Sequence, residues 1–173
     1  MSDALLNHVN ALVADFAAEY GTVDLVGRRF DCEPDEYDAL VETFETFGVV
    51  GGASIRVRDD SNRLLLVRHY GSEGWVDPGD SRRPGESYPE CAVRGVRETT
   101  GLDATVDDLD QIHLLYFDDW TDRRPMPNPY VCFDGRKRGG SIRPGDEITE
   151  VRWAAEFPND LLYEELAELR LDG

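Results

Sequence analysis

The chain has 173 residues, 40% of them hydrophobic, which is enough for one domain with its own core. Its formal net charge is −18, and no basic stripe runs along the sequence, so direct binding to nucleic acid is disfavoured. No run of about 18 apolar residues is present, and the first residues lack the basic start and cleavage site of a signal peptide. We therefore expect a cytoplasmic protein without a membrane span.

The basic charge is almost entirely arginine, because Lys137 is the only lysine among 18 basic residues. Acidic pairs such as Asp107–Asp108 and Asp118–Asp119 are spread along the chain rather than gathered in one block. Self-repulsion of this size is relieved when salt screens the charges. A lysine-poor, aspartate-rich surface resembles that of salt-adapted proteins, so we expect a halophilic source. An acidic mimic of nucleic acid is the alternative, and it would require a block of charge.

The first 48 residues are interpreted as a helical N-terminal extension. Apolar spacing predicts an amphipathic helix over residues 2–20 and a second helix over residues 35–47, with a short extended piece at residues 23–30. Pro34 near the first turn and Gly48 beyond the last turn fit the second helix. We expect this unit to pack on the main domain. The alternatives are a homodimer interface or an element that covers the substrate.

From residue 49 onward the apolar period changes from helical spacing to alternation, so a mixed α/β domain is expected over residues 49–173. The first two strands are expected to form a hairpin, and a helix is expected to close the domain. The predicted strands cover residues 53–58, 63–69, 112–117, 129–133 and 151–154, and the closing helix covers residues 160–169.

The stretch from residue 78 to residue 102 joins a loop rich in glycine and proline to a helix that ends at Gly101. Small residues and turn formers let the backbone of such a loop approach a ligand or a metal. The helix then carries charged side chains four residues apart on one face: Glu86, Glu90, Arg94 and Glu98. An acidic helix face beside such a loop is one way to hold a divalent cation next to a phosphate.

This stretch resembles the signature of the Nudix hydrolases, G-x5-E-x7-R-E-U-x-E-E-x-G-U, in which U is a bulky aliphatic residue. Three positions depart from the pattern: Asp80 stands at the first glycine, Gly95 at the first glutamate of the helix and Thr99 at the last. The matching residues are Glu86, Arg94, Val96, Glu98, Gly101 and Leu102.

The resemblance extends over residues 50–170. It includes the strand that ends at Arg68, the Trp75-x2-Pro-Gly segment, and the segment from Gly145 to Trp153. It implies the Nudix fold, an α/β/α sandwich with a mixed sheet, similar to that of MutT-like and ADP-ribose pyrophosphatase-like members. The first 48 residues lie outside it.

Nudix hydrolases cleave the pyrophosphate bond of a nucleoside diphosphate linked to another group, and the resemblance implies this activity here. Because the attacked diphosphate carries several negative charges, Mg²⁺ or sometimes Mn²⁺ neutralises its oxygens and orients the attacking water. A carboxylate then helps as general base. The expected partner is therefore a small nucleotide or nucleoside diphosphate derivative.

The resemblance assigns three residues of the helix and its loop to the catalytic site. Glu98 holds the retained glutamate position and is the strongest candidate for a metal ligand. Glu86 and Arg94 match positions whose main role is to lock the loop onto the helix through charge-assisted hydrogen bonds.

Three further candidates lie outside the helix. The carbonyl of Gly79 corresponds to a backbone metal ligand beside the substrate, and Glu147 matches a position that often carries a base or an extra metal ligand. Arg68, at the end of its strand, is a candidate contact for phosphate. The alternative for Glu147 is that it only forms part of a turn.

Gly95 and Thr99 remove two carboxylates of the family's metal-binding set, so the signature is degenerate. Glycine inside a helix also costs about 1 kcal/mol relative to alanine. Two hypotheses follow. The chain is a metal-dependent hydrolase with divergent metal ligation, or it is a Nudix-fold protein that binds a nucleotide-like ligand as a sensor or regulator without hydrolysing it.

The acidic surface generates a prediction about salt. The melting temperature should rise as KCl is raised from low to molar concentration, because screening removes self-repulsion from a chain of net charge −18. In a domain of this size, each kcal/mol gained is worth about 2–4 °C. Circular dichroism melts across a KCl series measure the effect, and a flat or falling curve would count against salt adaptation.

Overall fold

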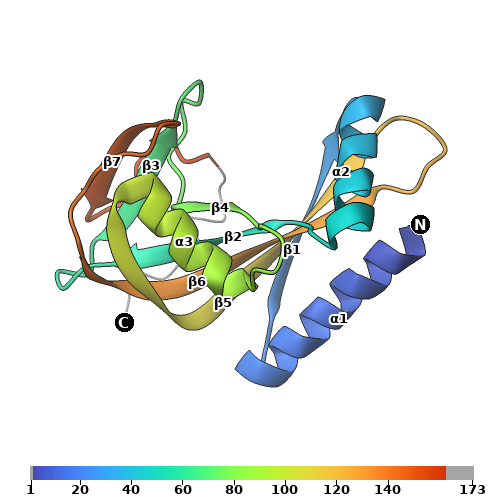
Figure 1. Cartoon of the computed structure of the whole chain (residues 1–173). Helices are drawn as coiled ribbons and strands as arrows, with labels where there is room; N and C mark the ends of the chain where they lie inside the picture. Colours follow the sequence, from blue (N-terminus) through green and yellow to red (C-terminus); the bar gives the residue numbers. More distant parts are fainter. Residues whose placement is uncertain (1, 163–173) are drawn as a thin grey trace.

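The computed structural model describes residues 2–162, which form one seven-stranded mixed sheet with three helices (Figure 1). The strand order is β1-β5-β6-β2-β3-β7, and β4 pairs with β2 beside this path. The predicted mixed α/β fold is confirmed. The elements are α1 (Ser2–Tyr20), β1 (Asp24–Asp31), α2 (Pro34–Phe47), β2 (Gly52–Arg58), β3 (Leu64–His69), β4 (Gly79–Ser81), α3 (Tyr88–Thr100), β5 (Leu102–Asp118), β6 (Met126–Gly140) and β7 (Ile148–Ala154).

The main hydrophobic core lies between α3 and the central strands, and Figure 1 shows α3 lying over β2. Successive residues of a strand point to opposite faces, so Ala53, Ile55 and Val57 of β2 all enter this core. Phe16 of α1 and Val96 of α3 belong to the same core. The alternate residues of β2 therefore face the other side of the sheet, away from α3.

The β5–β6 hairpin is much longer than the alternation of its residues predicts. The expected strands at residues 112–117 and 129–133 are only the central parts of β5 and β6. The pairing shifts register at three places in β5, after Asp103, after Val106 and after Leu109. Each shift moves later side chains to the opposite face, so a strict two-residue alternation is lost over a strand that still pairs.

The predicted hairpin between β2 and β3 is present at its turn only. Arg58 of β2 pairs with Leu64 of β3, and β3 then pairs antiparallel with β7 from Leu64 to His69. The three residues of β4 pair instead with Gly52, Ala53 and Ser54 at the start of β2. So short a strand has no periodicity of its own, and the sequence analysis interpreted it as loop.

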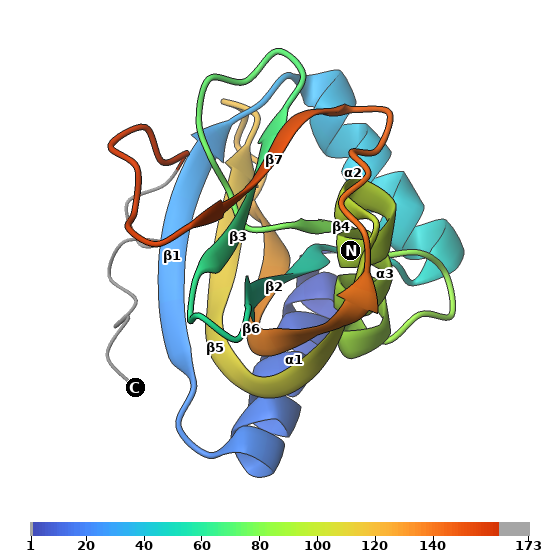
Figure 2. The same cartoon turned by 90° about the vertical axis from the view of Figure 1, so that its left-hand side faces the viewer.

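Both N-terminal helices form where the sequence predicts them. Gly48 ends α2 in the left-handed conformation, with φ of 63°, and its N–H donates to the carbonyl of Phe44. The extended piece between the helices is β1, which pairs in parallel with β5 along its whole length (Figure 2). The division at residue 48 stays a prediction, but β1 is part of the same sheet as the rest of the chain.

At the other end of the chain, the closing helix was expected over residues 160–169. Asp160, Leu161 and Leu162 are not helical, and the remainder of that range lies outside the described residues. None of the helices within residues 2–162 has the length and hydropathy needed to cross a membrane.

Gly95 is a point of close contact between α3 and the sheet. A Cβ placed there would lie 2.7 Å from the carbonyl carbon of Gly79 and 2.8 Å from the nitrogen of Asp80. These neighbours are backbone atoms of β4 and cannot move aside as a flexible side chain would. The glycine that lowers helix propensity therefore permits the helix to pack directly on β4.

The packing of Gly95 predicts that alanine at this position destabilises the fold, whereas helix propensity alone predicts that it stabilises the fold. Gly95→Ala should lower the free energy of unfolding by about 1–3 kcal/mol because of the clash with β4, although alanine is the better helix former by about 1 kcal/mol. Chemical denaturation measures the change. Glu90→Ala, at an exposed position of the same helix, is the control and should change stability by no more than about 0.5 kcal/mol. A more stable Gly95→Ala variant would contradict the packing argument.

Candidate active site

The guanidinium of Arg94 is the centre of a hydrogen-bonded cluster that joins α3, the preceding loop and β4. Its Nε donates to Oε1 of Glu86 at 2.6 Å, and its Nη2 donates to Oε2 of the same carboxylate at 3.0 Å. Nη1 donates to Oδ2 of Asp80 at 2.7 Å, and Nη2 to the carbonyl of Ser81 at 2.8 Å. The expected lock between Glu86 and Arg94 is therefore present, and it extends to Asp80, a residue that departs from the family pattern.

Local sequence explains why the helix starts where this cluster needs it. The hydroxyl of Ser87 accepts the N–H of Glu90 at 3.2 Å, and Pro89 sits in the first turn, where its missing N–H costs nothing. Gly101 ends the helix with φ of 78°. Arg94 thus lies on the turn of α3 that faces β4.

The cluster shifts the pKa values of its own members. The hydrogen bonds from Arg94 lower the pKa of the Glu86 carboxyl, opposed in part by burial and helped by the N–H of Arg83. The hydrogen bond to Glu86 likewise raises the pKa of Arg94. Both groups are therefore held in their charged forms, and the loop is held to the helix by ion pairs that water reaches poorly.

Glu98 lies one turn beyond Arg94 and is paired with two arginines. Its Oε2 accepts Nη1 of Arg94 at 3.0 Å, and Arg83 from the loop makes two parallel bonds to the carboxylate, at 3.2 and 2.9 Å. The side chains of Arg83 and Glu98 are 56% and 44% exposed. Exposed pairs of this kind contribute little stability, so Glu98 can exchange Arg83 for another cation at small cost.

The two other helix positions of the signature carry no acid here. Gly95 packs on β4, and the hydroxyl of Thr99 donates to the carbonyl of Gly95 at 2.6 Å. Across residues 2–162, no group of three or more histidine, cysteine, aspartate or glutamate side chains is arranged to hold a metal ion. The oxygen chemistry of Glu98 suits Mg²⁺, but this arrangement of side chains does not form a resident metal cluster.

The loop before β7 reaches the end of α3. The N–H of Gly145 donates to the carbonyl of Thr99 at 3.0 Å, and the carbonyl of Glu147 accepts the N–H of Tyr70 at 2.8 Å. Glu147 comes two residues after Gly145, which contacts Thr99, the residue that follows Glu98. The side chain of Glu147 is exposed. Gly79, the predicted backbone ligand, is on β4 opposite Ser54.

Arg68 is engaged elsewhere. It pairs with Asp160 at 2.7 Å and lies over the ring of Trp75, 4.3 Å from its centroid. Within the described part of the chain, no hydrogen bond or ion pair joins Arg68 to Arg94 or Glu98. The structure thus brings together Glu86, Arg94 and Glu98, and it leaves Arg68 in a separate cluster.

A cavity of 550 Å³ adjoins β4 on the sheet face opposite α3. Its lining includes Asp77 and His113, which are only 2% and 5% exposed, as well as Gly79 and Asp80 of β4. The hydroxyl of Ser54 donates to Oδ2 of Asp77 at 2.6 Å. Sequence reasoning missed Asp77 and His113. The available signal was the alternation of β2, which puts Ser54 on the face opposite the core, where a polar residue needs a partner.

Fold and site together define a class of protein: a mixed α/β domain in which a loop and helix present an arginine–carboxylate cluster beside a cavity at the sheet. A family model described as "NUDIX domain" matches residues 50–167. The chain belongs to the Nudix family, whose hydrolases generally depend on divalent metal ions.

Individual relatives are distant. A proposed 8-oxo-dGTP diphosphatase of Bacillus subtilis (strain 168) is 27% identical over 106 residues, which cover 60% of this chain and 65% of that protein. A Nudix hydrolase structure from Nitrosomonas europaea is 18% identical with a TM-score of 0.57, covering 69% of this chain and 66% of that one. The MutT protein of Methanosarcina mazei Go1 is 23% identical with a TM-score of 0.48, covering 61% and 75%. The matched part of this chain thus spans about two thirds of the length of the Bacillus subtilis and Nitrosomonas europaea proteins.

The lowered pKa of Glu86 gives a prediction with a definite pH dependence. Glu86→Gln should lower the free energy of unfolding at pH 7 by about 1–2 kcal/mol, because it weakens bonds to Arg94 in a half-buried cluster. A lowered pKa stabilises the fold above the unfolded value of about 4.3, and the stabilisation is lost as pH falls through the folded pKa. The gap between wild type and variant should therefore close in acid.

Urea denaturation from pH 7 to pH 3 measures this gap. Glu90→Gln is the matched control, since Glu90 lies on the same helix but makes no ion pair among the described residues. A gap that stays constant with pH, or that equals the Glu90→Gln effect, would contradict the assignment.

Proposed function

We propose that this chain is a Nudix hydrolase that cleaves the pyrophosphate bond of nucleoside-diphosphate-linked compounds, with a divergent set of metal ligands. The observation that carries the proposal is the arrangement of Glu98, Arg94 and Arg83 on the loop and helix of a chain that belongs to the family. The name of the Bacillus subtilis relative supports a nucleotide as substrate. That relative is a diphosphatase by name, so a sensor without hydrolysis is the less favoured alternative.

The proposal keeps Mg²⁺ or Mn²⁺ as cofactor, with Glu98 as the one carboxylate that α3 supplies. The carbonyl of Gly79 and the carboxylate of Glu147 are the proposed further ligands. When bound, the ion would neutralise phosphate oxygens and lower the pKa of a water molecule. So small a ligand set implies weak binding of the ion in the absence of substrate.

The arginines of the cluster take separate roles in this proposal. Arg94, half-buried and bound to Glu86, Asp80 and Ser81, holds the loop in place against the helix. The side chain of Arg83 is exposed, and it is bound to Glu98 through a surface pair. Arg83 can therefore turn to a diphosphate oxygen, since a guanidinium binds phosphate with the same fork that binds carboxylate. That movement would release Glu98 from Arg83, leaving its bond to Arg94.

The acidic surface suits a salt-rich cytoplasm, which we propose as the working environment of this hydrolase. Screening there would also allow an anionic substrate to approach a chain of net charge −18. We also keep the proposal that the first 48 residues form a homodimer interface.

The test is hydrolysis of ADP-ribose and a panel of nucleotides, with Mg²⁺ or Mn²⁺ at high salt. Wild type should release phosphate-containing products, and Glu98→Gln should lower kcat by about 100-fold. Glu90→Gln, on the same helix, should retain wild-type kcat. Binding of nucleotides without turnover by the wild-type chain across the whole panel would overturn the hydrolase proposal in favour of the sensor.

A further inference from the structure

A groove of about 410 Å³ lies between α1 and the loop that leads into α3, and we call it the α1 groove. Figure 1 shows the start of α3 approaching α1, and the buried rings of Phe16 and Tyr88 meet there with centroids 6.2 Å apart. The cavity beside β4 has other lining residues, among them Arg28 and Phe30 of β1. The lining of the α1 groove includes His8, Leu12, Asp15, Phe16, Arg82 and Tyr88.

α1 lines this groove with one face. The side chains that it contributes follow one another at intervals of three or four residues, from His8 through Leu12 to Asp15, so they lie in a row along the helix. At 1.5 Å per residue, Asp15 lies about 10 Å beyond His8 along the helix axis. The groove therefore has two polar ends, with an apolar stretch between them.

Arg82 lies at the His8 end of the groove. Its Nε donates to the carbonyl of Glu86 at 2.6 Å, and its guanidinium lies over the ring of Tyr88, 4.8 Å from the centroid. Among residues 2–162, no carboxylate pairs with Arg82, although the chain has 36 acidic residues. The positive charge of this half-buried side chain is therefore not neutralised by a carboxylate from the described protein.

Two buried polar atoms at this end have no hydrogen bond. They are Nη1 of Arg82 and Nε2 of His8, and neither finds a partner in the part of the chain that the structure describes. Burial, and after it the charge of Arg82, lowers the pKa of His8, so the ring is neutral at pH 7. One ligand oxygen can accept from both atoms when the ring hydrogen is on Nε2. Because Arg82 is only half-buried, a small rotation of its side chain presents Nη1 to the groove.

The other end of the groove is acidic. Asp15 is exposed, and its carboxylate makes no ion pair or hydrogen bond with the other described residues. Glu19, one turn further along the same face, adds a second negative charge. These carboxylates repel the far end of a purely anionic ligand and attract an ammonium group. The groove thus favours a ligand that is anionic at one end and cationic at the other.

We propose that the α1 groove binds a small zwitterionic ligand, a short peptide with free ends. Its carboxylate would bind between Arg82 and His8, and its ammonium group would bind at Asp15. Leu12 and Phe16 would contact its apolar body. An extended tripeptide spans about 10 Å, which is the separation of the two polar ends. The groove volume is within the range of small-ligand sites. The inference goes beyond the proposed function and does not rest on it.

The experiment is calorimetric titration of the full chain with the tripeptide Ala-Leu-Ala, at the lowest KCl concentration at which the wild type remains folded. Low salt is used because screening weakens both charge contacts. The peptide with free ends should bind most tightly. Its C-terminal amide should bind about tenfold or more weakly, because the hydrogen bonds to a charged group are lost. Its N-acetyl form should bind about two- to fivefold more weakly, because it loses only a pair with an exposed carboxylate.

Two variants assign these effects to residues. Arg82→Gln should bring the affinities of the free and amidated peptides to within about twofold of each other, and Asp15→Asn should do the same for the free and acetylated peptides. Because Asp15 is exposed, its variant tests the acidic end even if Arg82→Gln does not fold.

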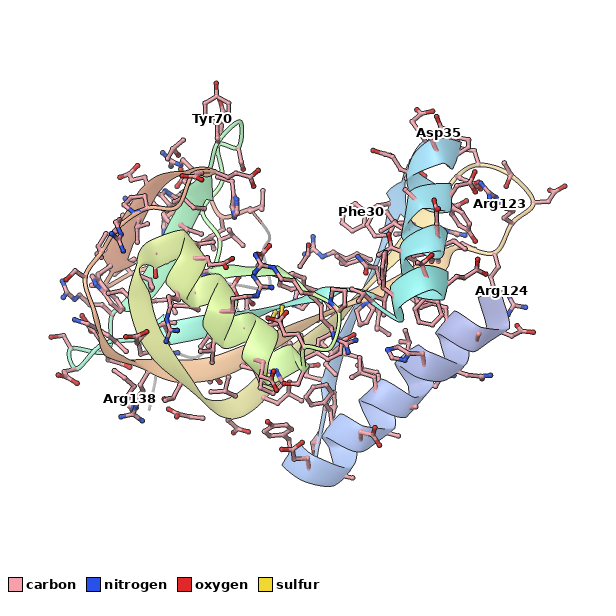
Figure 3. All side chains as sticks on the ribbon, in the orientation of Figure 1. Phe30, Asp35, Tyr70, Arg123, Arg124 and Arg138 are labelled. Atoms are coloured by element: carbon pink, nitrogen blue, oxygen red, sulfur yellow. The ribbon has the colours of Figure 1, made fainter. Side chains whose placement is uncertain are left out.

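Arg124→Gln is the matched control. Figure 3 shows Arg124 beside the first turn of α1, where it pairs with Asp3 at 3.3 Å, and it does not line the groove. This variant should bind the free peptide within about twofold of wild type. Absence of binding at millimolar concentration, an amide that binds as tightly as the free peptide, or equal effects of Arg82→Gln and Arg124→Gln would overturn the proposal.

The outcome separates this inference from the proposed function. Glu98 does not line the groove, so Glu98→Gln should leave the affinity for the free peptide within about twofold of wild type while it lowers hydrolysis. Peptide binding by a chain that hydrolyses no nucleotide would defeat the hydrolase and leave the groove assignment standing. Hydrolysis by a chain that binds no peptide would leave the hydrolase standing and defeat the groove assignment.

Discussion

The ion pair between Arg94 and Glu86 is the interaction on which the candidate site depends. It fixes the loop against α3, and the same guanidinium reaches Asp80 and the carbonyl of Ser81, so loop, helix and β4 share one anchor. Because the pair is half-buried, its loss would leave carboxylates poorly solvated rather than simply released to water. The contact of Gly95 with β4 then sets how closely the helix approaches the sheet.

The charge of the cluster is organised around arginine rather than around a set of acids. Glu98 meets two guanidinium groups, and the positions that could add carboxylates are taken by a glycine in contact with backbone and a threonine bonded to its own helix. Because Asp80, Glu86 and Glu98 already pair with these two guanidinium groups, an anionic ligand must displace a carboxylate to reach either of them. Arg83, whose pair with Glu98 is exposed, is the guanidinium that a ligand can displace at the smaller cost.

Sequence reasoning succeeded where spacing alone decides the geometry. Glu86 and Arg94 are eight residues apart, and their pairing follows once the helix and its loop are recognised. Sequence reasoning failed where pairing between distant segments of the chain decides the geometry. The ends of β5 and β6 lie beyond register shifts that break the alternation. β4 exists only because β2 offers it a partner. Asp77 and His113 are buried by strands that are distant from them in the sequence. Arg68 pairs with Asp160 and lies over the ring of Trp75, and sequence spacing gives no sign of either contact.

The parallel pairing of β1 with β5 has a consequence for the order of folding. Bonds within the Arg94 cluster close loops of at most 15 residues, whereas the bond from Gln111 to Asp24 closes one of 87. Loop-closure entropy makes the longer contact costlier by about 1.6 kcal/mol. The loop and helix can therefore form early from local contacts, and β1 joins the sheet late. Native-state hydrogen exchange would then show β1 opening before α3, with the cavity lost while the cluster persists.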